Sequence, residues 1–243
     1  MSKESGLGDH LYVDSYDLSG DVGSVSAIGA PFGVLPITGI DKYAPERVAA
    51  HLDGVITFQS WFNPDSGQAH DKLSGLPRTD VIGSYFHGGA IGNVAASLVA
   101  KQVGYDGQRG ADGSLTMATS LTANGWGLEW GLQGTAGQRT DTAATNGSSL
   151  DGGAATALGL QAYLHVFSLT GTDCTVAVED SANNSTWAAL ADGAFAEATG
   201  GTSERIATAA DATVRRYLRV VTTGTFTECV FAVNLVRNAS ALA

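Results

Sequence analysis

Residues that could carry out chemistry are few in this sequence, and their spacing matches no common catalytic motif. The nucleophile elbow G-x-S-x-G, the phosphate-binding loop G-x-x-x-x-G-K-[ST] and the zinc motif H-E-x-x-H do not occur in it. His87-Gly88-Gly89 looks like an oxyanion-hole loop, but no elbow accompanies it. Gly125-x-Gly127 lacks the third glycine of a dinucleotide fingerprint and lies between expected strands. The motifs therefore predict neither a nucleophilic enzyme nor a nucleotide site.

The remaining titratable residues show no metal-ligand pattern either. Asp14, Asp17 and Asp21 do not fit the spacing of an EF-hand loop, and we interpret them as solvated turn carboxylates. Five scattered histidines are interpreted as surface or hydrogen-bonded structural residues: His10, His51, His70, His87 and His165. No pair of carboxylates stands out as the acid and base of a glycosidase. We therefore expect no catalytic residues, no metal and no cofactor, and hence a structural protein instead of an enzyme.

The two cysteines, Cys174 and Cys229, are predicted to be small buried hydrophobic side chains. Each shares its expected strand face with large apolar residues, Val176 and Val178 for Cys174 and Phe231 for Cys229. Two cysteines are too few for a disulfide framework. A single disulfide between them stays open, because neighbouring strands would permit it and a cytoplasmic origin would disfavour it.

The charge balance argues against a nucleic-acid ligand. The chain has 13 basic and 24 acidic residues, a net charge of −11, whereas affinity for DNA depends on Lys and Arg that neutralise phosphates. Charged residues make up only 15% of the chain, and 32 residues are glycine. Such a composition is typical of a protein largely covered by copies of itself. The alternative is an Ala/Gly-rich β protein from a GC-rich genome.

Neither a targeting segment nor a membrane span is expected. The first residues, Met1–Ser5, are not a basic segment followed by an apolar run. No run of about 18 apolar residues occurs in the chain. The sequence therefore predicts a soluble product made in a cytoplasm.

The strongest local pattern runs from Leu52 to Pro64. Asp53-Gly54 is a turn signal, and a run rich in β-branched and aromatic residues follows it. Alternation at period two divides this strand into two faces, Ile56, Phe58 and Phe62 on one and Thr57, Gln59 and Trp61 on the other. The second face combines a tryptophan with uncharged polar groups, which suits a partner subunit better than bulk water.

A short helix is expected directly after this strand, near residues 66–75. Asp65 followed by Gln68 resembles a capping box. Ala69 and Leu73 recur at helical spacing. The helix is the main exception in a chain whose other segments indicate β-structure.

Other strands of the first half are expected within residues 11–30, 34–40, 79–87, 95–105 and 114–122. Pro36 indicates an edge strand or a bend. Asp41–Leu52 is interpreted as a long excursion between strands, and such connections are usually functional or disordered.

A change of composition divides the chain. Residues 135–157 are almost wholly Thr, Ala, Gly, Ser and Asn, typical of a linker or exposed arm. Short strands then follow at regular intervals, typical of an immunoglobulin-like or jelly-roll β-sandwich. We predict a β domain with the short helix over 1–140, a flexible linker or arm over 141–157, and an accessory β-sandwich over 158–243. The core of the last part would bury nine apolar side chains: Leu164, Val166, Val176, Val178, Leu218, Val220, Phe231, Val233 and Leu235.

The order of these elements resembles the major tail protein, or tail tube protein, of long-tailed, non-contractile bacteriophages. The resemblance is carried by Ser60-Trp61-Phe62-Asn63-Pro64 with the helix after it, by Val81–Phe86 and Ala95–Gly104, and by Leu115–Gly125. Asp41–Leu52 also resembles the segment that precedes the inner-sheet strand in that family. Thr186-Trp187-Ala188 and Arg216-Tyr217-Leu218-Arg219-Val220 resemble the accessory β-sandwich that many of these proteins append.

The resemblance implies a mainly β fold, a tail-tube β-sandwich or barrel followed by an immunoglobulin-like or jelly-roll sandwich. It implies a virion protein, assembled in the host cytoplasm, that forms rings, usually of six subunits, stacked into a hollow tube. Its partners would be itself and other tail proteins, with no membrane and with double-stranded DNA only in transit during ejection. Because duplex DNA is densely negative, an acidic tube would repel it and let it slide.

Two candidate sites follow. The length of Tyr43–Leu52 and its mixture of charge and apolar area predict an intersubunit contact, to the next ring, through Tyr43, Arg47 and Val48. The strand face of Thr57 and Gln59 is predicted to line the lumen, since no basic residue occurs between Val55 and Trp61.

Two other classes of protein stay open. A module that binds host-surface carbohydrate would use Trp187, Tyr163 and Tyr217 as an aromatic platform, although core or rim packing explains the same residues. A capsid decoration protein would share the virion location. A glycosidase is the least favoured class.

Overall fold

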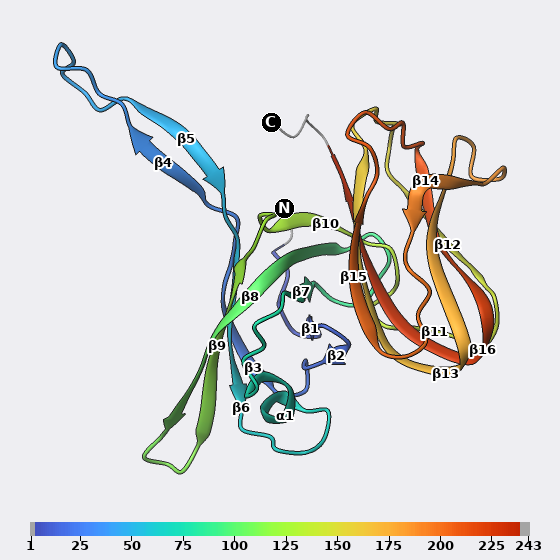
Figure 1. Cartoon of the computed structure of the whole chain (residues 1–243), viewed down its shortest axis with the longest axis horizontal. Coiled ribbons are helices and arrows are strands. Elements are labelled where there is room, and N and C mark those ends of the chain that lie inside the picture. The colour runs from blue at the N-terminus through green and yellow to red at the C-terminus, as the bar shows by residue number, and fades with distance from the viewer. Residues whose placement is uncertain (1–2, 239–243) are drawn as a thin grey trace. The chain divides into compact units, whose positions relative to one another are not determined.

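A computed structural model describes residues 3–238 of the chain (Figure 1). Strands dominate these residues, and α1 (Ala69–Leu73) is the only α-helix assigned among them. The predicted mainly β fold class is thereby confirmed. The strands are β1 (His10–Val13), β2 (Tyr16–Asp17), β3 (Val22–Gly29), β4 (Phe32–Pro36), β5 (Arg47–Leu52), β6 (Val55–Trp61), β7 (Val81–Phe86), β8 (Val94–Arg109), β9 (Leu115–Ala123), β10 (Glu129–Gln133), β11 (Arg139–Asp141), β12 (Asn146–Asp151), β13 (Leu160–Ser181), β14 (Ala188–Ala194), β15 (Thr202–Ala207) and β16 (Tyr217–Arg237).

The chain forms two compact units, and each is discontinuous in sequence. Unit 1 contains the residues up to Gly20, Ile82–Ser97 and the residues from Trp130 onward, whereas unit 2 contains Asp21–Val81 and Leu98–Glu129. This division differs from the predicted boundaries at 1–140, 141–157 and 158–243. The physical reason is that strands of the first half pair and pack with strands of the second half.

β13 and β16 form the central strand pair of unit 1. They pair antiparallel from Leu160 opposite Arg237 to Ser181 opposite Tyr217. β10, β11 and β12 pair with β16, and β14 and β15 pair with β13. The nine side chains predicted for this core are all buried: Leu164, Val166, Val176, Val178, Leu218, Val220, Phe231, Val233 and Leu235.

The segment predicted as a flexible linker, 141–157, is an ordered part of unit 1. It contains β12, which pairs with β16 so that Leu150 lies opposite Leu218. At its start, Asp141 forms an ion pair with Arg139 at 2.6 Å and accepts a hydrogen bond from Thr222 Oγ1 at 2.7 Å. The small polar residues of this segment do not predict a strand by themselves. Pairing with β16 holds them in a strand. The linker prediction is therefore wrong for β12.

Strands of the first half complete the core of unit 1. Tyr12 of β1 and Phe86 of β7 are fully buried in a cluster with Ala232 of β16, and Phe167 of β13 packs against it. The ring centroid of Tyr12 lies 5.1 Å from that of Phe86 and 4.9 Å from that of Phe167. Residues 158–238 therefore share their packing with the N-terminal strands and do not form a separate sandwich, and residues 239–243 of the predicted domain lie outside the described residues.

Unit 2 is built on an antiparallel sheet in the order β3–β6–β9–β8. Ile56 and Phe58 of β6 are buried, in agreement with the predicted alternation. Phe62 lies beyond the end of β6 and is 39% exposed, so it does not belong to the buried face. α1 buries Ala69 and Leu73.

The helix α1 is shorter than the predicted 66–75 and begins differently. Its N-cap residue, Gln68, makes no side-chain cap hydrogen bond. Instead, the buried carboxylate of Asp21 accepts hydrogen bonds from Ala69 N at 2.9 Å and from Asn63 Nδ2 at 2.8 Å. A carboxylate that is distant in sequence thus caps the helix, in place of the predicted box from Asp65.

Candidate assembly surfaces

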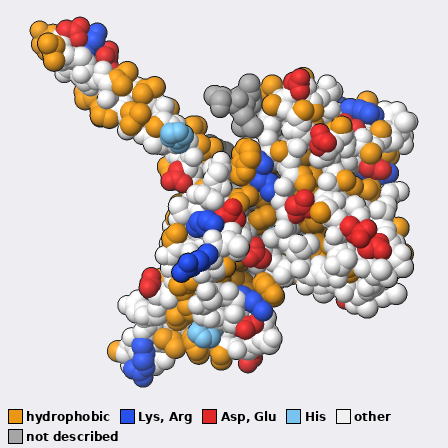
Figure 2. All heavy atoms as spheres, viewed as in Figure 1, with side chains coloured by type: hydrophobic (Ala, Val, Ile, Leu, Met, Phe, Trp, Pro, Cys, Tyr) orange, Lys and Arg blue, Asp and Glu red, His pale blue; other side chains and the backbone are white. Residues whose placement is uncertain are grey.

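A two-stranded ribbon over residues 31–53, here called the arm, exposes apolar side chains along its length (Figures 1 and 2). Among the described strands, β4 and β5 pair only with each other. Hydrogen bonds hold the arm at its base, from Asp53 N to Pro31 O at 2.8 Å, and near its tip, from Ile37 N to Glu46 O at 2.9 Å. Eight large apolar side chains of the arm are exposed: Phe32, Val34, Leu35, Ile37, Ile40, Tyr43, Val48 and Leu52.

The register of the arm distributes these side chains over both faces. Leu35 lies opposite Val48 on one face, whereas Phe32 lies opposite Leu52 on the other. A two-stranded ribbon without a packed face is marginally stable by itself in water. Large exposed apolar patches on a protein surface mark sites of interaction with another molecule. The arm is therefore the first candidate interaction surface.

The three predicted contact residues all lie on the arm. Tyr43, in the turn between β4 and β5, is fully exposed, and Val48 is 44% exposed. Arg47 is also exposed and lies opposite Pro36. The interpretation of Asp41–Leu52 as a long excursion between strands is wrong in its second half, because Arg47–Leu52 forms the strand β5. Whether these residues contact another subunit stays a prediction.

The apolar partners on β4 were missed by the sequence analysis, although a signal for them exists. Val48, Ala50 and Leu52 are apolar at period two, and so are Phe32 and Val34. Two alternating runs separated by a polar turn indicate a hairpin. Pro36 at the end of the first run obscured this signal, because it suggested a bend.

The open face of β6 and β9 is the second candidate surface. Thr57 and Gln59 are half-buried on it. Thr57 Oγ1 lies 3.1 Å from Ser120 Oγ, and Gln59 Nε2 donates to Thr116 Oγ1 at 2.9 Å. Since directly opposed residues share a sheet face, the register places all four on one uncharged polar surface. The two predicted lumen residues are thus neighbours on one face, and their orientation toward a lumen stays a prediction.

Charged groups on this face come from β8. By register, Lys101 lies opposite Thr122 and Asp106 lies opposite Ala118, both on the face of Thr57. Lys101 Nζ lies 2.8 Å from a carboxylate oxygen of Asp80. The positive charge of this lysine is therefore compensated locally.

The arrangement closest to a catalytic pair is a buried network in unit 1. His165 Nε2 lies 2.7 Å from Ser84 Oγ, and His165 Nδ1 donates to the backbone oxygen of Asp14 at 2.5 Å. Ser84 Oγ also lies 2.6 Å from Ser97 Oγ. His165, Ser84 and Ser97 are fully buried, so a substrate has no access to them. Burial also lowers the pKa of His165 to about 4, which keeps the imidazole neutral. This network pairs polar groups of the core.

The aromatic residues considered for carbohydrate binding do not form an open platform. Tyr163 is fully buried. The guanidinium carbon of Arg219 lies 4.4 Å from the ring centroid of Trp187, and that of Arg216 lies 4.9 Å from the ring centroid of Tyr217. These arginines occupy ring faces that a sugar would need.

Cys174 and Cys229 are buried and not joined by a disulfide, which confirms their prediction as buried side chains. Burial raises the pKa of both thiols. Within residues 3–238, His, Cys, Asp and Glu form no group of three that could hold a metal ion. No helix in this part of the chain has the length and apolar character to cross a membrane.

Comparisons with known proteins identify no family. No protein-family model and no curated protein matches the chain. Among solved structures, it is similar to the Dit protein of phage SPP1, described as a paradigm of the hub adsorption apparatus in phages that infect Gram-positive bacteria. The two share 12% identity with a TM-score of 0.33, over 94% of this chain and 99% of that one. A likeness this low carries no argument about function.

Proposed function

We propose that the chain is a structural, non-enzymatic virion protein that polymerises as stacked rings into the tail tube of a phage. The resemblance of the sequence to tail tube proteins supports this, together with one structural observation that carries it. That observation is the arm, which exposes apolar side chains on both faces and has no core of its own. The apolar side chains of such a ribbon are removed from water only when another molecule packs against them.

The proposal assigns copies of the same chain as the partners of the arm. An arm that binds a different surface of the next copy makes a heterologous, head-to-tail contact. Contacts of this type close into rings or continue as open filaments. In the proposed tube the arm joins one ring to the next, and Tyr43, Arg47 and Val48 are among its contact residues.

The free edge of β3 in unit 2 supports closure of a ring. Among the described strands, β3 pairs only with β6, so its other edge has no partner strand. The outer part of β8, from Tyr105 to Arg109, pairs with β9. Exposed edges are templates for pairing with another chain. Addition of β3 of one copy to β8 of the next would continue the sheet around the ring.

The open face of the same sheet suits the wall of a DNA conduit. Binding of duplex requires Lys and Arg that are free to neutralise phosphates. Thr57, Gln59, Thr116 and Ser120 on this face are uncharged, and Lys101 is paired with Asp80. The net charge of −11 opposes adhesion of DNA to the assembly as a whole. We assign this face to the lumen.

Electron microscopy of the purified protein at high concentration tests the proposal. The wild-type chain is expected to form rings or tubes. A variant with Asn-Gly in place of residues 33–51 retains the pair Phe32 and Leu52 around a two-residue turn. This variant should keep the circular dichroism spectrum and melting temperature of the wild type but remain monomeric. Wild-type monomers at every concentration would overturn the proposal.

A second variant tests the predicted contact residues. Replacing Tyr43, Arg47 and Val48 with Ser should leave the monomer folded and abolish stacking. A matched control replaces three exposed carboxylates outside the arm with Ser and should polymerise normally: Glu197, Asp211 and Glu228. Tubes of unchanged length in the arm variant would exclude these three residues from the contact.

A further inference from the structure

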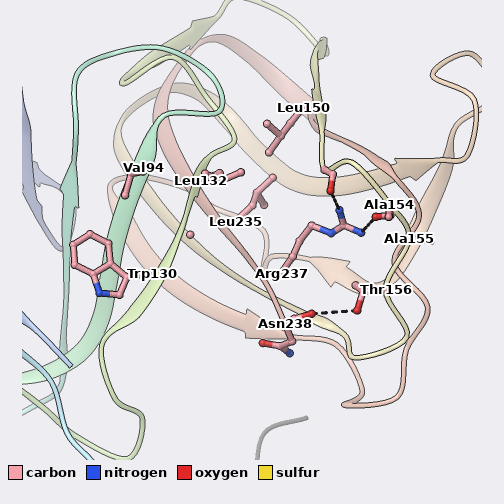
Figure 3. A pocket seen from close by; sticks show the side chains of 12 residues that line it. Val94, Trp130, Leu132, Leu150, Ala154, Ala155, Thr156, Leu235, Arg237 and Asn238 are labelled. Atoms are coloured by element: carbon pink, nitrogen blue, oxygen red, sulfur yellow. Dashed lines mark hydrogen bonds between the residues drawn. The ribbon is translucent and has the colours of Figure 1, made fainter. Parts of the chain in front are cut away.

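Unit 1 contains an open groove whose lining is mostly apolar (Figure 3). Its volume is about 600 Å³. The lining comes from the start of β8, from β10, from β12 and the segment after it, and from the end of β16, and includes Val94, Trp130, Leu132, Leu150, Ala155 and Arg237. Trp130 is 48% exposed, although tryptophan is among the largest apolar side chains.

The polar side chains of the groove make hydrogen bonds within the chain, although the Nε atom of Arg237 is buried without a partner among the described residues. Arg237 Nη2 donates to Ala154 O at 2.6 Å. Thr156 Oγ1 donates to Asn238 O at 3.1 Å, and Asn238 Nδ2 donates to Leu158 O at 2.6 Å. A polar ligand would have to compete for these groups, whereas an apolar one would not. The groove therefore fits an apolar occupant.

Charge leads to the same conclusion. Of the described residues that line the groove, only Arg237 is charged, and its guanidinium donates hydrogen bonds to backbone oxygens. No carboxylate of residues 3–238 belongs to the lining. An uncharged side chain can therefore enter the groove without burying an unpaired charge next to itself.

The tip of the arm presents side chains of this kind. Ile40 and Tyr43 are both 109% exposed, beyond the end of the strand pair. The two carboxylates of the tip, on Asp41 and Glu46, are balanced by Lys42 and Arg47. Lys42 Nζ lies 3.6 Å from Asp41 Oδ2 and 3.7 Å from Glu46 Oε1. The tip thus offers two large uncharged protrusions without bringing excess charge of its own.

We propose that the groove of unit 1 receives the arm tip of a second copy of this chain, with Ile40 and Tyr43 inserted against the exposed side chains of Val94 and Trp130. The inference rests on the proposed function, because it names the surface to which the arm binds. Protrusion and groove are different surfaces of one polypeptide, so every copy offers both halves of the contact. The contact is heterologous and repeats from copy to copy instead of ending at a dimer.

Cross-linking between copies tests this pairing directly. Ile40→Cys protein is mixed with Ala155→Cys protein and treated with a short bismaleimide. The native cysteines are buried and do not react in the folded chain. The linked peptides are identified by mass spectrometry and are expected in about tenfold excess over a control mixture, because a specific contact raises the local concentration. The control uses Ala191→Cys, an exposed alanine of β14 outside the groove.

Equal yields of the two cross-links would overturn the inference, whether or not micrographs show tubes. Tubes without the Ile40–Ala155 product would leave the proposed function standing and place the receiving surface elsewhere.

A variant with a blocked groove provides an independent test. Ala155→Trp fills the groove from an exposed position and should abolish stacking with an unchanged melting temperature, whereas Ala191→Trp should stack normally. Normal tubes from Ala155→Trp would also count against the groove.

Discussion

At the scale of single residues, four buried polar side chains of unit 1, those of Asn234, Ser97, Ser84 and His165, form a continuous hydrogen-bonded network, although Asn234 Oδ1 has no partner within the described residues. Asn234 Nδ2 donates to Ser97 Oγ at 2.9 Å, and Ser97 contacts Ser84, which contacts His165. Because Nδ1 of His165 donates to the Asp14 backbone, the neutral ring can accept from Ser84 through Nε2. A buried hydrogen-bonded network of this kind is costly to disturb.

The lowered pKa of His165 predicts a loss of stability in mild acid. The pKa is 6.5 in the unfolded chain and about 4 in the folded chain, so the unfolded chain binds the proton first as the pH falls. The contribution of neutral His165 is complete above pH 6.5 and decreases toward pH 4, by about 3 kcal/mol in total. Urea-unfolding midpoints measured across this pH range test the prediction.

Replacement of the ring provides the control for this titration. His165→Gln should unfold at lower urea concentration overall but lose most of the pH dependence between pH 6.5 and 4. The pH dependence of stability that His87 contributes has the opposite sign, because hydrogen bonding to Glu4 and the charge of Asp9 raise the pKa of His87. Its contribution is present below pH 6.5 and is lost as the pH rises through the raised pKa. An undiminished acid slope in His165→Gln would exclude the assignment.

At the scale of elements, local patterns identified strands whose order comes from their own sequence. The alternation of Ile56 and Phe58 lies within β6, and the structure agrees. Asp53-Gly54 does not form the predicted turn but links β5 to β6, and Gly54 is required there because a Cβ would lie 2.3 Å from Leu128 N. The nine predicted core residues of β13 and β16 are buried for the same reason. Strands with one consistent apolar face can be recognised without knowledge of their partners.

Elements that depend on distant partners were not predictable in this way. β12 consists mainly of small polar residues and is a strand because β16 pairs with it. The cap of α1 comes from Asp21, which lies 48 positions before Ala69 in the sequence. The arm and the open face contain the predicted residues, but β4 as the second strand of the arm escaped notice. Pairing across long sequence separations decided each of these features.

The pairing of distant segments predicts that the chain cannot be shortened at residue 146. Truncation after Asn146 removes β13 and β16, and with them Phe167 and Ala232 from the cluster around Tyr12. Loss of packing around a large buried side chain costs about 3–5 kcal/mol, against a total stability of about 5–15 kcal/mol. The fragment is expected to lack cooperative unfolding of unit 1 by circular dichroism. A fragment that melts cooperatively and still polymerises would restore the predicted independent sandwich.

At the scale of the whole molecule, the low content of charged residues and the unpaired surfaces both favour contacts between copies of the chain. Only 15% of the residues are charged, and the arm, the edge of β3 and the groove of unit 1 are all without partners among the described residues. A monomer in solution would have to keep three such surfaces exposed. Repeated contacts between copies would cover all three surfaces, so a homopolymer would leave none of them exposed to water.

The excess of acidic residues has two possible locations in such a polymer. Acidity on the outside would keep assembled tails soluble, whereas acidity on the inside would repel DNA. The part of this face that β6 and β9 form around Thr57 and Gln59 is uncharged, and its role in the conduit would be to avoid binding phosphates. A change of charge at these two positions therefore distinguishes a lumen wall from an outer surface.

Thr57→Lys with Gln59→Lys places two new positive charges from every subunit on the DNA path if this face lines the lumen. Phage that carry both substitutions should assemble full-length tails but eject DNA more slowly, with the defect easing as salt shortens the screening length from about 10 Å at 0.1 M to about 3 Å at 1 M. Ejection kinetics in a dye-accessibility assay at several salt concentrations measure the effect. Thr57→Glu with Gln59→Glu is the matched control, since it loses the same hydrogen bonds to Ser120 and Thr116 without attracting phosphates. Normal ejection from intact tails of the lysine variant would show that this face does not line the channel.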